Sequence, residues 1–344
     1  MKIALDAMGG DFAPGNPVEG AIAALRDFPD VSVVFVGDEK KVREELLRHD
    51  TEGLTERISV HHASQVVDMS DSGIDSVRKK KDSSVSRAVD LVKNGTADAI
   101  VSAGHTGALV AAATIKLRTL PGIDRAGLAV LIPADEGVFL LIDGGANIDP
   151  DPGHIVGFAV MGSIYYRELL GCPEPKVGLF NIGTEASKGT EFARECHALL
   201  STAPINFAGN VEGHGIFRKP VEVVVCDGFV GNIVLKTIEG LAKSFFGWFR
   251  EELKKNPVRL LGALLCRGAF RSIKNRTSTD EYGGTPLLGV NGICIKAHGN
   301  SSARALRNAI RVARAAVGQQ VNRRIVEAIQ SHHEKVPKGQ AAPA

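Results

Sequence analysis

Short runs of apolar, mostly β-branched residues recur along the chain, and a polar or glycine-rich turn follows each of them. Within runs such as EVVVC the apolar residues follow one another instead of alternating, which is typical of strands covered on both faces of a parallel sheet. Helix-like segments often stand between the runs and indicate βαβ units. The sequence therefore predicts an α/β fold with a mainly parallel sheet, and the predicted strands are Lys2–Ala7, Ser32–Gly37, Ala99–Ala103, Val138–Asp143, Lys176–Ile182, Val221–Cys226 and Ile293–Ala297.

The turns after these runs carry most of the polar, glycine-spaced segments of the chain. In parallel α/β sheets, ligands bind beyond the carboxyl ends of the strands. We therefore expect one active site along that edge, although glycine and asparagine also simply make turns. The segments are AMGGD, GDEK, GHTGA, GGANID, GTEASKG, DGFVGN and HGNSS.

The segment Leu241–Arg276 differs from the rest of the chain. Pro257 splits it into two helix-like pieces, and after Glu252 all of its charges are positive. One interpretation is a basic amphipathic hairpin that lies on an anionic membrane, and the other is a helix pair at a dimer interface. In the first, the membrane-contacting residues are Trp248, Leu260, Leu261, Leu264 and Leu265.

Length and composition fit one large domain. The chain has 344 residues, of which 44% are hydrophobic and 23% charged, which is ordinary for a globular protein. We predict a single α/β domain over residues 1–334, with 241–276 as an excursion, and a disordered tail over 335–344. With 5% aromatic residues and a net charge of +2, nucleic acid is not an expected partner.

The sequence has no apolar run approaching the roughly 20 residues that cross a bilayer, and its N-terminus does not read as a signal peptide. We therefore expect a cytoplasmic protein. Five cysteines lack CxxC spacing, and no His/Cys cluster has zinc spacing, so reduced thiols and no metal site are expected.

Two GxxG loops are candidates for phosphate binding, because the sequence contains neither GxGxxG nor a P-loop motif. Gly104–Gly107, with His105 and Thr106, and Gly228–Gly231 each follow a predicted strand and precede a helix-like run. Glycines in such loops let backbone amides approach an anion at a helix N-terminus. A GxxG loop alone is weak evidence.

A cation stands in the glycine-bounded loop GTEASKG. Lys188 there, near Asn181 and Glu185, could hold a phosphate or a developing oxyanion. An exposed surface lysine is the alternative.

The strongest local signal is CDGFVGNIVLKTIEG. Asn232 and Lys236 are spaced to share one helix face, and Asp227 is either a catalytic carboxylate or an N-cap. Cys226 is interpreted as a buried thiol. Further along, His298 stands at another strand end and could donate to an oxyanion or act as acid or base, with a structural turn histidine as the alternative.

Two basic clusters could be docking surfaces for an acidic protein or simply solvated faces. One is the arginine row on the C-terminal helix candidate, and the other is a run of four cations near the middle of the N-terminal half. Their members are Arg304, Arg307, Arg311 and Arg314, and Arg78, Lys79, Lys80 and Lys81.

Taken in order, the motifs resemble the bacterial phosphate acyltransferases of phospholipid synthesis. The matching stretches, from Ile3 to His298, are LDAMGGD, RKKKDSS, SAGHTGAL, GGANID, NIGTEASKG, VVCDGFVGN with LKTIEG, YGG with LLGVNG, and IKAHG. One departure is His105, where the family usually has asparagine. Both side chains can donate a hydrogen bond, but a histidine adds a charge that titrates near neutrality.

The resemblance implies a homodimeric three-layer α/β/α enzyme, similar in fold to isocitrate and isopropylmalate dehydrogenases and to phosphotransacetylases. It implies transfer of a fatty acyl group from acyl carrier protein to inorganic phosphate. It also implies peripheral membrane association, where a partner acyltransferase uses the acyl phosphate on glycerol 3-phosphate. No metal or organic cofactor is expected.

Phosphate is already an anionic nucleophile, so such an enzyme needs no serine or cysteine nucleophile. Our hypothesis assigns phosphate to the Gly228–Gly231 turn, Asn232 and Lys188, and the oxyanion to His298 or an amide of Gly104–Gly107. Competing functions are phosphotransacetylase-like transfer from acyl-CoA, a decarboxylating dehydrogenase of the same fold, and a non-catalytic membrane scaffold.

Overall fold

The computed structural model describes residues 1–68, 70–277 and 279–335, in which the strands form one mixed sheet. The strands are β1 (Lys2–Asp6), β2 (Ser32–Gly37), β3 (Ile58–His62), β4 (Ala99–Ser102), β5 (Gly127–Pro133), β6 (Val138–Ile142), β7 (Lys176–Asn181), β8 (Asn206–Glu212), β9 (Val223–Val225), β10 (Thr285–Leu288) and β11 (Ile293–Lys296). The main helices are α1 (Gly15–Asp27), α2 (Glu39–Leu46), α3 (Gly73–Lys79), α4 (Ser84–Lys93), α5 (Thr106–Leu117), α6 (Pro152–Leu170), α7 (Glu191–Thr202), α8 (Gly228–Lys254), α9 (Pro257–Leu265), α10 (Arg267–Thr277), α11 (Thr279–Tyr282), α12 (Ala303–Gly318) and α13 (Val321–Lys335).

The sheet consists of two parallel blocks that run in opposite directions. Its strand order is β3-β2-β1-β4-β11-β10-β5-β6-β9-β7-β8. Strand β10 is antiparallel to both β11 and β5, and β5 is antiparallel to β6, whereas the neighbours within each block are parallel. The prediction of a mainly parallel sheet is confirmed. The expectation of one common carboxyl edge is wrong, because the antiparallel strands β5 and β10, which the pattern did not single out, reverse the direction of the second block.

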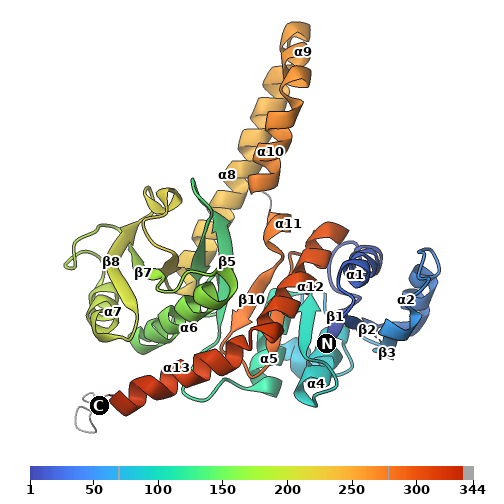
Figure 1. The fold of residues 1–344 in the computed structure, drawn as a ribbon, viewed down its shortest axis with the longest axis horizontal. Coiled ribbons are helices and arrows are strands. Elements are labelled where there is room, and N and C mark those ends of the chain that lie inside the picture. Colours follow the sequence, from blue (N-terminus) through green and yellow to red (C-terminus); the bar gives the residue numbers. More distant parts are fainter. Residues whose placement is uncertain (69, 278, 336–344) are drawn as a thin grey trace.

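Helices cover both faces of each block, which gives the predicted three layers (Figure 1). In β6, Leu140 and Ile142 pack in the cluster that contains Phe158 of α6, and Phe139 and Leu141 pack in a cluster on the opposite face. The alternate burial explains why the apolar residues of the strand are consecutive. In the first block, α1 and α12 pack against each other, and so do α4 and α5.

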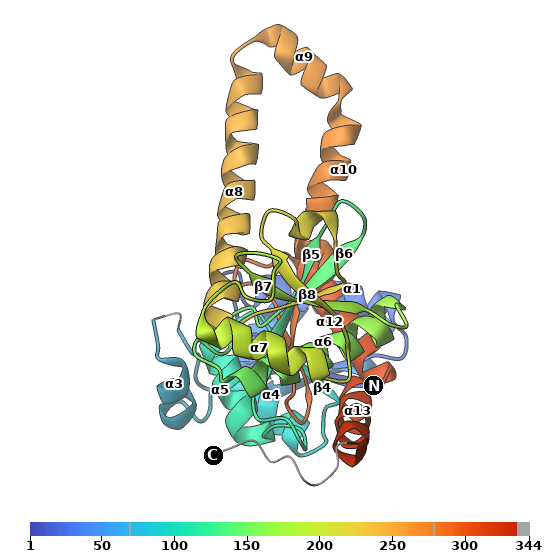
Figure 2. The same ribbon diagram turned by 90° about the vertical axis from the view of Figure 1, so that its left-hand side faces the viewer.

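A helical hairpin projects away from the body of the protein (Figures 1 and 2). It consists of the distal part of α8 with α9 and α10, so the predicted excursion 241–276 begins inside a helix that starts at Gly228. The hairpin has three helical pieces and not two, because breaks occur both before Pro257 and at Cys266. Trp248 is 63% exposed and Leu265 81% exposed.

The C-terminal helix α13 ends at Lys335. The tail predicted to be disordered begins at that residue, and its remainder, 336–344, lies outside the described residues. Among the helices that the structure describes, none combines the length and the apolar character needed to cross a bilayer.

Candidate active site

A cleft of about 1570 Å³ has walls from both blocks of the sheet. It is larger than the roughly 300–1,000 Å³ of most small-ligand pockets. Helix α5, strand β5 and helix α8 supply an apolar wall, whose members include Val110, Ile115, Leu128, Val130, Ile132, Leu235 and Ile238. The polar lining comes from Gly104, Thr106 and Gly107, the loop 144–147, the first turns of α8, and residues of the segment that follows β11. The cleft can therefore hold a ligand that is polar at one part and long and apolar at another.

The N-terminus of α5 opens onto this cleft through Gly104, Thr106 and Gly107. The side chain of His105 caps the helix, since its Nδ1 accepts a hydrogen bond from the amide of Ala108 at 3.1 Å. A histidine ring nitrogen accepts such a hydrogen bond through its lone pair. Asparagine is also a favoured N-cap residue, and this explains how histidine can replace it here. His105 itself does not line the cleft.

The glycines of the second GxxG loop serve close packing. Gly231 lies so near the loop after β6 that an added Cβ would stand 1.9 Å from the carbonyl oxygen of Asp143. A Cβ on Gly228 would stand 2.5 Å from the carbonyl oxygen of Asn147, which accepts a hydrogen bond from the Gly228 amide at 2.7 Å. Asp227 is the N-cap of α8 and accepts from the Val230 amide at 2.8 Å. None of these three residues lines the cleft, so the structure favours the packing and capping roles.

Asp143 holds the loop 144–147 in place and was not identified from the sequence. It is fully buried, and its carboxylate accepts the amides of Leu128, Gly145, Ala146 and Asn147 and the side chain of Asn147 at 2.7–3.0 Å. Burial raises the pKa of Asp143, and these hydrogen bonds oppose that rise. The available signal was an aspartate directly after a buried strand and before two glycines.

Asn232 and Lys236 line the cleft from one face of α8, as their spacing predicted. Gly145 lies close to Asn232, since an added Cβ would stand 3.2 Å from the Cβ of Asn232. The Nζ of Lys236 forms an ion pair with Glu239 at 2.8 Å, and the lysine is largely exposed. The loop after β6 therefore fixes the surroundings of Asn232.

His298 also lines the cleft. The amide of Asn300 donates a hydrogen bond to its Nδ1 at 3.3 Å, so in the neutral ring the proton is on Nε2. The structure thus brings His298 together with Asn232 and Lys236 and gives it a donor nitrogen.

Lys296 is a second residue that sequence reasoning missed. It ends β11, lines the cleft and is only 8% exposed. Burial lowers the pKa of Lys296 to about 8, although the charge of Asp6 acts in the opposite direction. Asp6 is itself buried, which raises the pKa of its carboxyl, and it accepts the Ser102 hydroxyl at 2.6 Å. A lysine at the end of the otherwise apolar strand ICIK was the signal in the sequence.

The structure does not bring Asn181, Glu185 and Lys188 to the cleft. They lie at the end of β7 and in the loop after it, where the Asn181 side chain donates to the Lys188 carbonyl at 3.2 Å and the Asn210 side chain to the Glu185 carbonyl at 2.8 Å. Lys188 is exposed, which is the alternative that the sequence left open.

The thiol of Cys226 is buried against the carbonyl of Asp143, and burial raises its pKa well above the usual value. This arrangement favours a structural cysteine. Within residues 1–68, 70–277 and 279–335 no group of three or more His, Cys, Asp or Glu side chains is arranged to hold a metal ion.

The architecture is that of the phosphotransacylases. A phosphotransacetylase from Streptococcus pyogenes superposes with a TM-score of 0.58 at 19% identity, covering 96% of this chain and 94% of that one. A branched-chain phosphotransacylase from Enterococcus faecalis V583 has a TM-score of 0.54 at 14% identity and covers 92% and 99%. At these identities the likeness establishes the fold alone.

The family follows from the sequence relatives. The profile of the family described as fatty acid synthesis protein matches residues 1–324. A phosphate acyltransferase from Akkermansia muciniphila is 50% identical over 95% of both chains, and one from Geobacter sp. (strain M21) is 51% identical over 95% of this chain and 92% of its own. The chain therefore belongs to this family of acyltransferases, as its motifs indicated.

Proposed function

We propose that the protein transfers a long-chain fatty acyl group from acyl carrier protein to inorganic phosphate and so supplies acyl phosphate for phosphatidic acid synthesis. The observation that carries the proposal is the composite cleft. Two lysines, a histidine and a helix N-terminus line the same cavity as a long apolar wall. A phosphate and an acyl chain can therefore bind side by side.

In the proposed arrangement the phosphate contacts Lys296 and Lys236 and lies at the N-terminus of α5, where backbone amides and the helix dipole favour an anion. Asn232 donates from the α8 side of the cleft. The acyl chain lies along the apolar wall formed by α5, β5 and α8. This assignment replaces the Gly228–Gly231 turn by the first turn of α5.

Transfer begins when an oxygen of HPO₄²⁻ attacks the thioester carbonyl carbon. The Nε2 proton of His298 faces the oxyanion of the tetrahedral intermediate, whose charge it stabilises. The carbon–sulfur bond then breaks, Lys296 donates a proton to the thiolate, and the phosphate hydroxyl returns a proton to Lys296. The pKa of about 8 for Lys296 is close to the roughly 8.5 of an ordinary thiol, and such a match suits proton transfer.

Lys188 was the cation that the sequence assigned to phosphate. For it to take part, the loop that contains it must approach the cleft, since none of its residues is in the cleft wall. The proposal therefore assigns the cationic role to Lys296 and Lys236.

The test is incubation of the purified protein with palmitoyl-acyl carrier protein and phosphate, with hydroxylamine added to trap acyl phosphate. We expect acyl hydroxamate that requires phosphate and is lost in Lys296→Met and His298→Ala. Palmitoyl-CoA and acetyl-CoA are compared as donors, because preference for acetyl-CoA would favour the phosphotransacetylase-like alternative. Failure of the wild-type protein to release carrier thiol in the presence of phosphate would refute the proposal.

We further propose that the enzyme is cytoplasmic and acts as a homodimer at a membrane surface, near a glycerol-3-phosphate acyltransferase. The exposed leucines Leu260, Leu261, Leu264 and Leu265 of α9 support membrane contact. Changing these four residues to serine should abolish flotation with anionic liposomes, while Leu47→Ser and Ile148→Ser on the body should leave it intact. Unchanged flotation together with a loss of dimer in sedimentation would instead favour the dimer-interface interpretation of the hairpin.

A further inference from the structure

Two basic clusters on the surface differ in how their charges are balanced. On α12, three of the four arginines form ion pairs with acids in the described part of the chain. Arg304 pairs with Glu281, Arg307 with Asp27, and Arg314 with Asp30 at 2.9 Å. Arg307 and Arg314 also lie over the ring of Phe28. These arginines connect α12 to α1 and α11, and most of their charge is already neutralised within the protein.

The second cluster has unpaired cations. Lys80 pairs with Asp71 at 2.6 Å and Asp68 at 3.3 Å. Among the described residues, Arg78, Lys79 and Lys81 have no acidic partner within 4.0 Å, and all three are exposed. This part of the surface therefore retains three positive charges that can act on a partner.

The unpaired cations stand next to the cleft. Arg78 and Ile115 line both the cleft and a smaller hollow of about 570 Å³, which Lys81 also lines. Helix α3 packs on α5 (Figure 2). Ile74 of α3 is 56% exposed and Ile115 of α5 is 52% exposed, so apolar side chains accompany the cations at the rim. We define the α3 rim as Ile74, Arg78, Lys79, Lys81 and Ile115.

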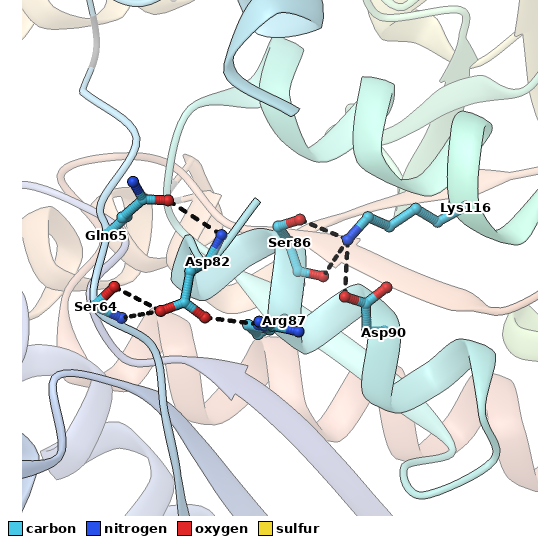
Figure 3. Close-up of polar contacts among 7 residues, drawn as sticks. All are labelled: Ser64, Gln65, Asp82, Ser86, Arg87, Asp90 and Lys116. Carbon is cyan, nitrogen blue, oxygen red and sulfur yellow. Dashed lines mark hydrogen bonds and ion pairs between the residues drawn. The ribbon is translucent and has the colours of Figure 1, made fainter. Parts of the chain in front are cut away.

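Polar contacts join α4 to α5 and to the segment 64–65 (Figure 3), and Arg87, Asp90 and Lys116 line the same smaller hollow as Arg78 and Lys81. Arg87 donates to Asp82 at 2.7 Å, and Lys116 donates to Asp90 at 2.9 Å and to the Ser86 hydroxyl at 2.6 Å. The hydrogen bonds from Ser64 and Arg87 hold the pKa of Asp82 well below its usual range. Arg87 and Lys116 therefore form contacts within the protein. The cations that can contact a partner are those of the α3 rim.

We propose that the α3 rim is the docking surface for the acidic carrier protein that delivers the acyl thioester, an inference that rests on the proposed function. Unpaired positive charges attract an acidic protein and raise its association rate. Ile74 and Ile115 provide apolar contact within the charged area, as protein interfaces commonly do. Since Ile74, Arg78 and Ile115 also line the cleft, a carrier bound there has its thioester arm at the cleft opening.

The test uses the full-length protein and the double variant Lys79→Glu/Lys81→Glu, whose residues do not line the cleft. The matched control is Lys40→Glu/Lys93→Glu, which changes two other exposed lysines and gives the same net charge. Each protein is assayed with palmitoyl-acyl carrier protein and with palmitoyl-pantetheine, a donor that has neither protein nor phosphate. We expect the rim variant to raise the KM for the carrier donor by roughly tenfold or more at low salt, with turnover of palmitoyl-pantetheine unchanged.

The wild-type KM for the carrier donor should also rise with added salt, because salt screens such attraction, and this dependence should be weaker in the rim variant. Equal KM values for the rim and control variants would overturn the proposal, as would an equal loss with both donors. It is likewise overturned if the rim variant loses binding to anionic vesicles while its KM for the carrier donor stays unchanged. If wild type uses palmitoyl-pantetheine but not the carrier donor, the donor in the proposed function is wrong, and the docking inference falls with it.

Discussion

Replacing Lys296 by methionine should remove activity and at the same time stabilise the protein. Lys296 is 8% exposed, and burial lowers its pKa from 10.5 to about 8. Each tenfold change in proton affinity is worth about 1.4 kcal/mol, so carrying this charge at neutral pH costs the folded state about 3 kcal/mol. Methionine has a similar length and no charge. Because Asp6 loses a favourable neighbour, we expect a net gain of about 1 to 3 kcal/mol at pH 7.

The pKa of Lys296 in the folded and in the unfolded chain determines how its contribution to the free energy of unfolding changes with pH. Below pH 8 the lysine is protonated in both the folded and the unfolded chain, and the folded state carries the full cost. Between about pH 8 and 10.5 the unfolded chain holds a proton that the folded chain has released, so the free energy of unfolding of the wild type rises with pH from this group. The advantage of Lys296→Met should therefore be largest below pH 8 and should fade towards pH 10.5.

The assay is urea unfolding of wild type, Lys296→Met and Lys236→Met at several pH values between 6 and 10. Lys236 lines the same cleft but is exposed, so its replacement should change stability by less than about 0.5 kcal/mol. If Lys296→Met is less stable than wild type at pH 7, the buried ammonium is a net stabilising partner of Asp6, and the reasoning is refuted. In activity assays, kcat/KM of wild type should fall above about pH 8, where free Lys296 loses its proton.

Three further substitutions test the site. Gly231→Ala should unfold or inactivate the protein, because the added Cβ would stand 1.9 Å from the Asp143 carbonyl oxygen. The control Gly240→Ala places its Cβ in open space and should stabilise α8 by up to about 1 kcal/mol. Equal thermal midpoints for the two variants would contradict the packing role of Gly231. His105→Ala should cost about 1 kcal/mol through the lost N-cap and His105→Asn much less, and a result in the reverse order in urea unfolding would rule the cap out. His298→Ala should lower kcat by roughly 100-fold or more, with His298→Gln partly active, and wild-type turnover in a correctly folded His298→Ala would exclude the oxyanion role.

Much of the fold follows from burial, which the sequence reports directly. Leu140 and Ile142 face one helical layer and Phe139 and Leu141 the other, so β6 is apolar at consecutive positions and could be recognised as a doubly covered strand. The direction of a strand within the sheet does not follow from burial. Strand β5, GLAVLIP, is just as apolar as the strands of the two parallel blocks. Its antiparallel orientation depends on the pairing with β6 and β10, which leaves no local mark in the sequence. The reversal of the second block was therefore not predictable from the pattern.

The candidate site, like the fold, was predictable from the sequence only in part. The i, i+4 spacing placed Asn232 and Lys236 on one face of α8, and His298 was recognised from its position after a strand; all three line the cleft. The second GxxG motif pointed to phosphate because glycine serves both anion binding and close backbone packing. The structure distinguishes the two roles, because a Cβ added to Gly231 would stand too close to the Asp143 carbonyl oxygen. Lys296 was overlooked because its position at the end of an apolar strand is a weak signal, and the burial that alters its proton affinity is visible only in the structure.

The reversal of the second block explains why the site needs both halves of the sheet. The first block contributes the N-terminus of α5, Lys296 and His298, which suit an anion and a developing negative charge. Strand β5 and the first turns of α8, beside the second block, contribute much of the apolar wall together with Asn232 and Lys236. With all strands in one direction, the loops would form a single polar edge and no long apolar wall would lie beside it. The antiparallel strands β10 and β5 thus join the proposed anion site to the apolar wall, and the proposed reaction of a thioester with phosphate requires both.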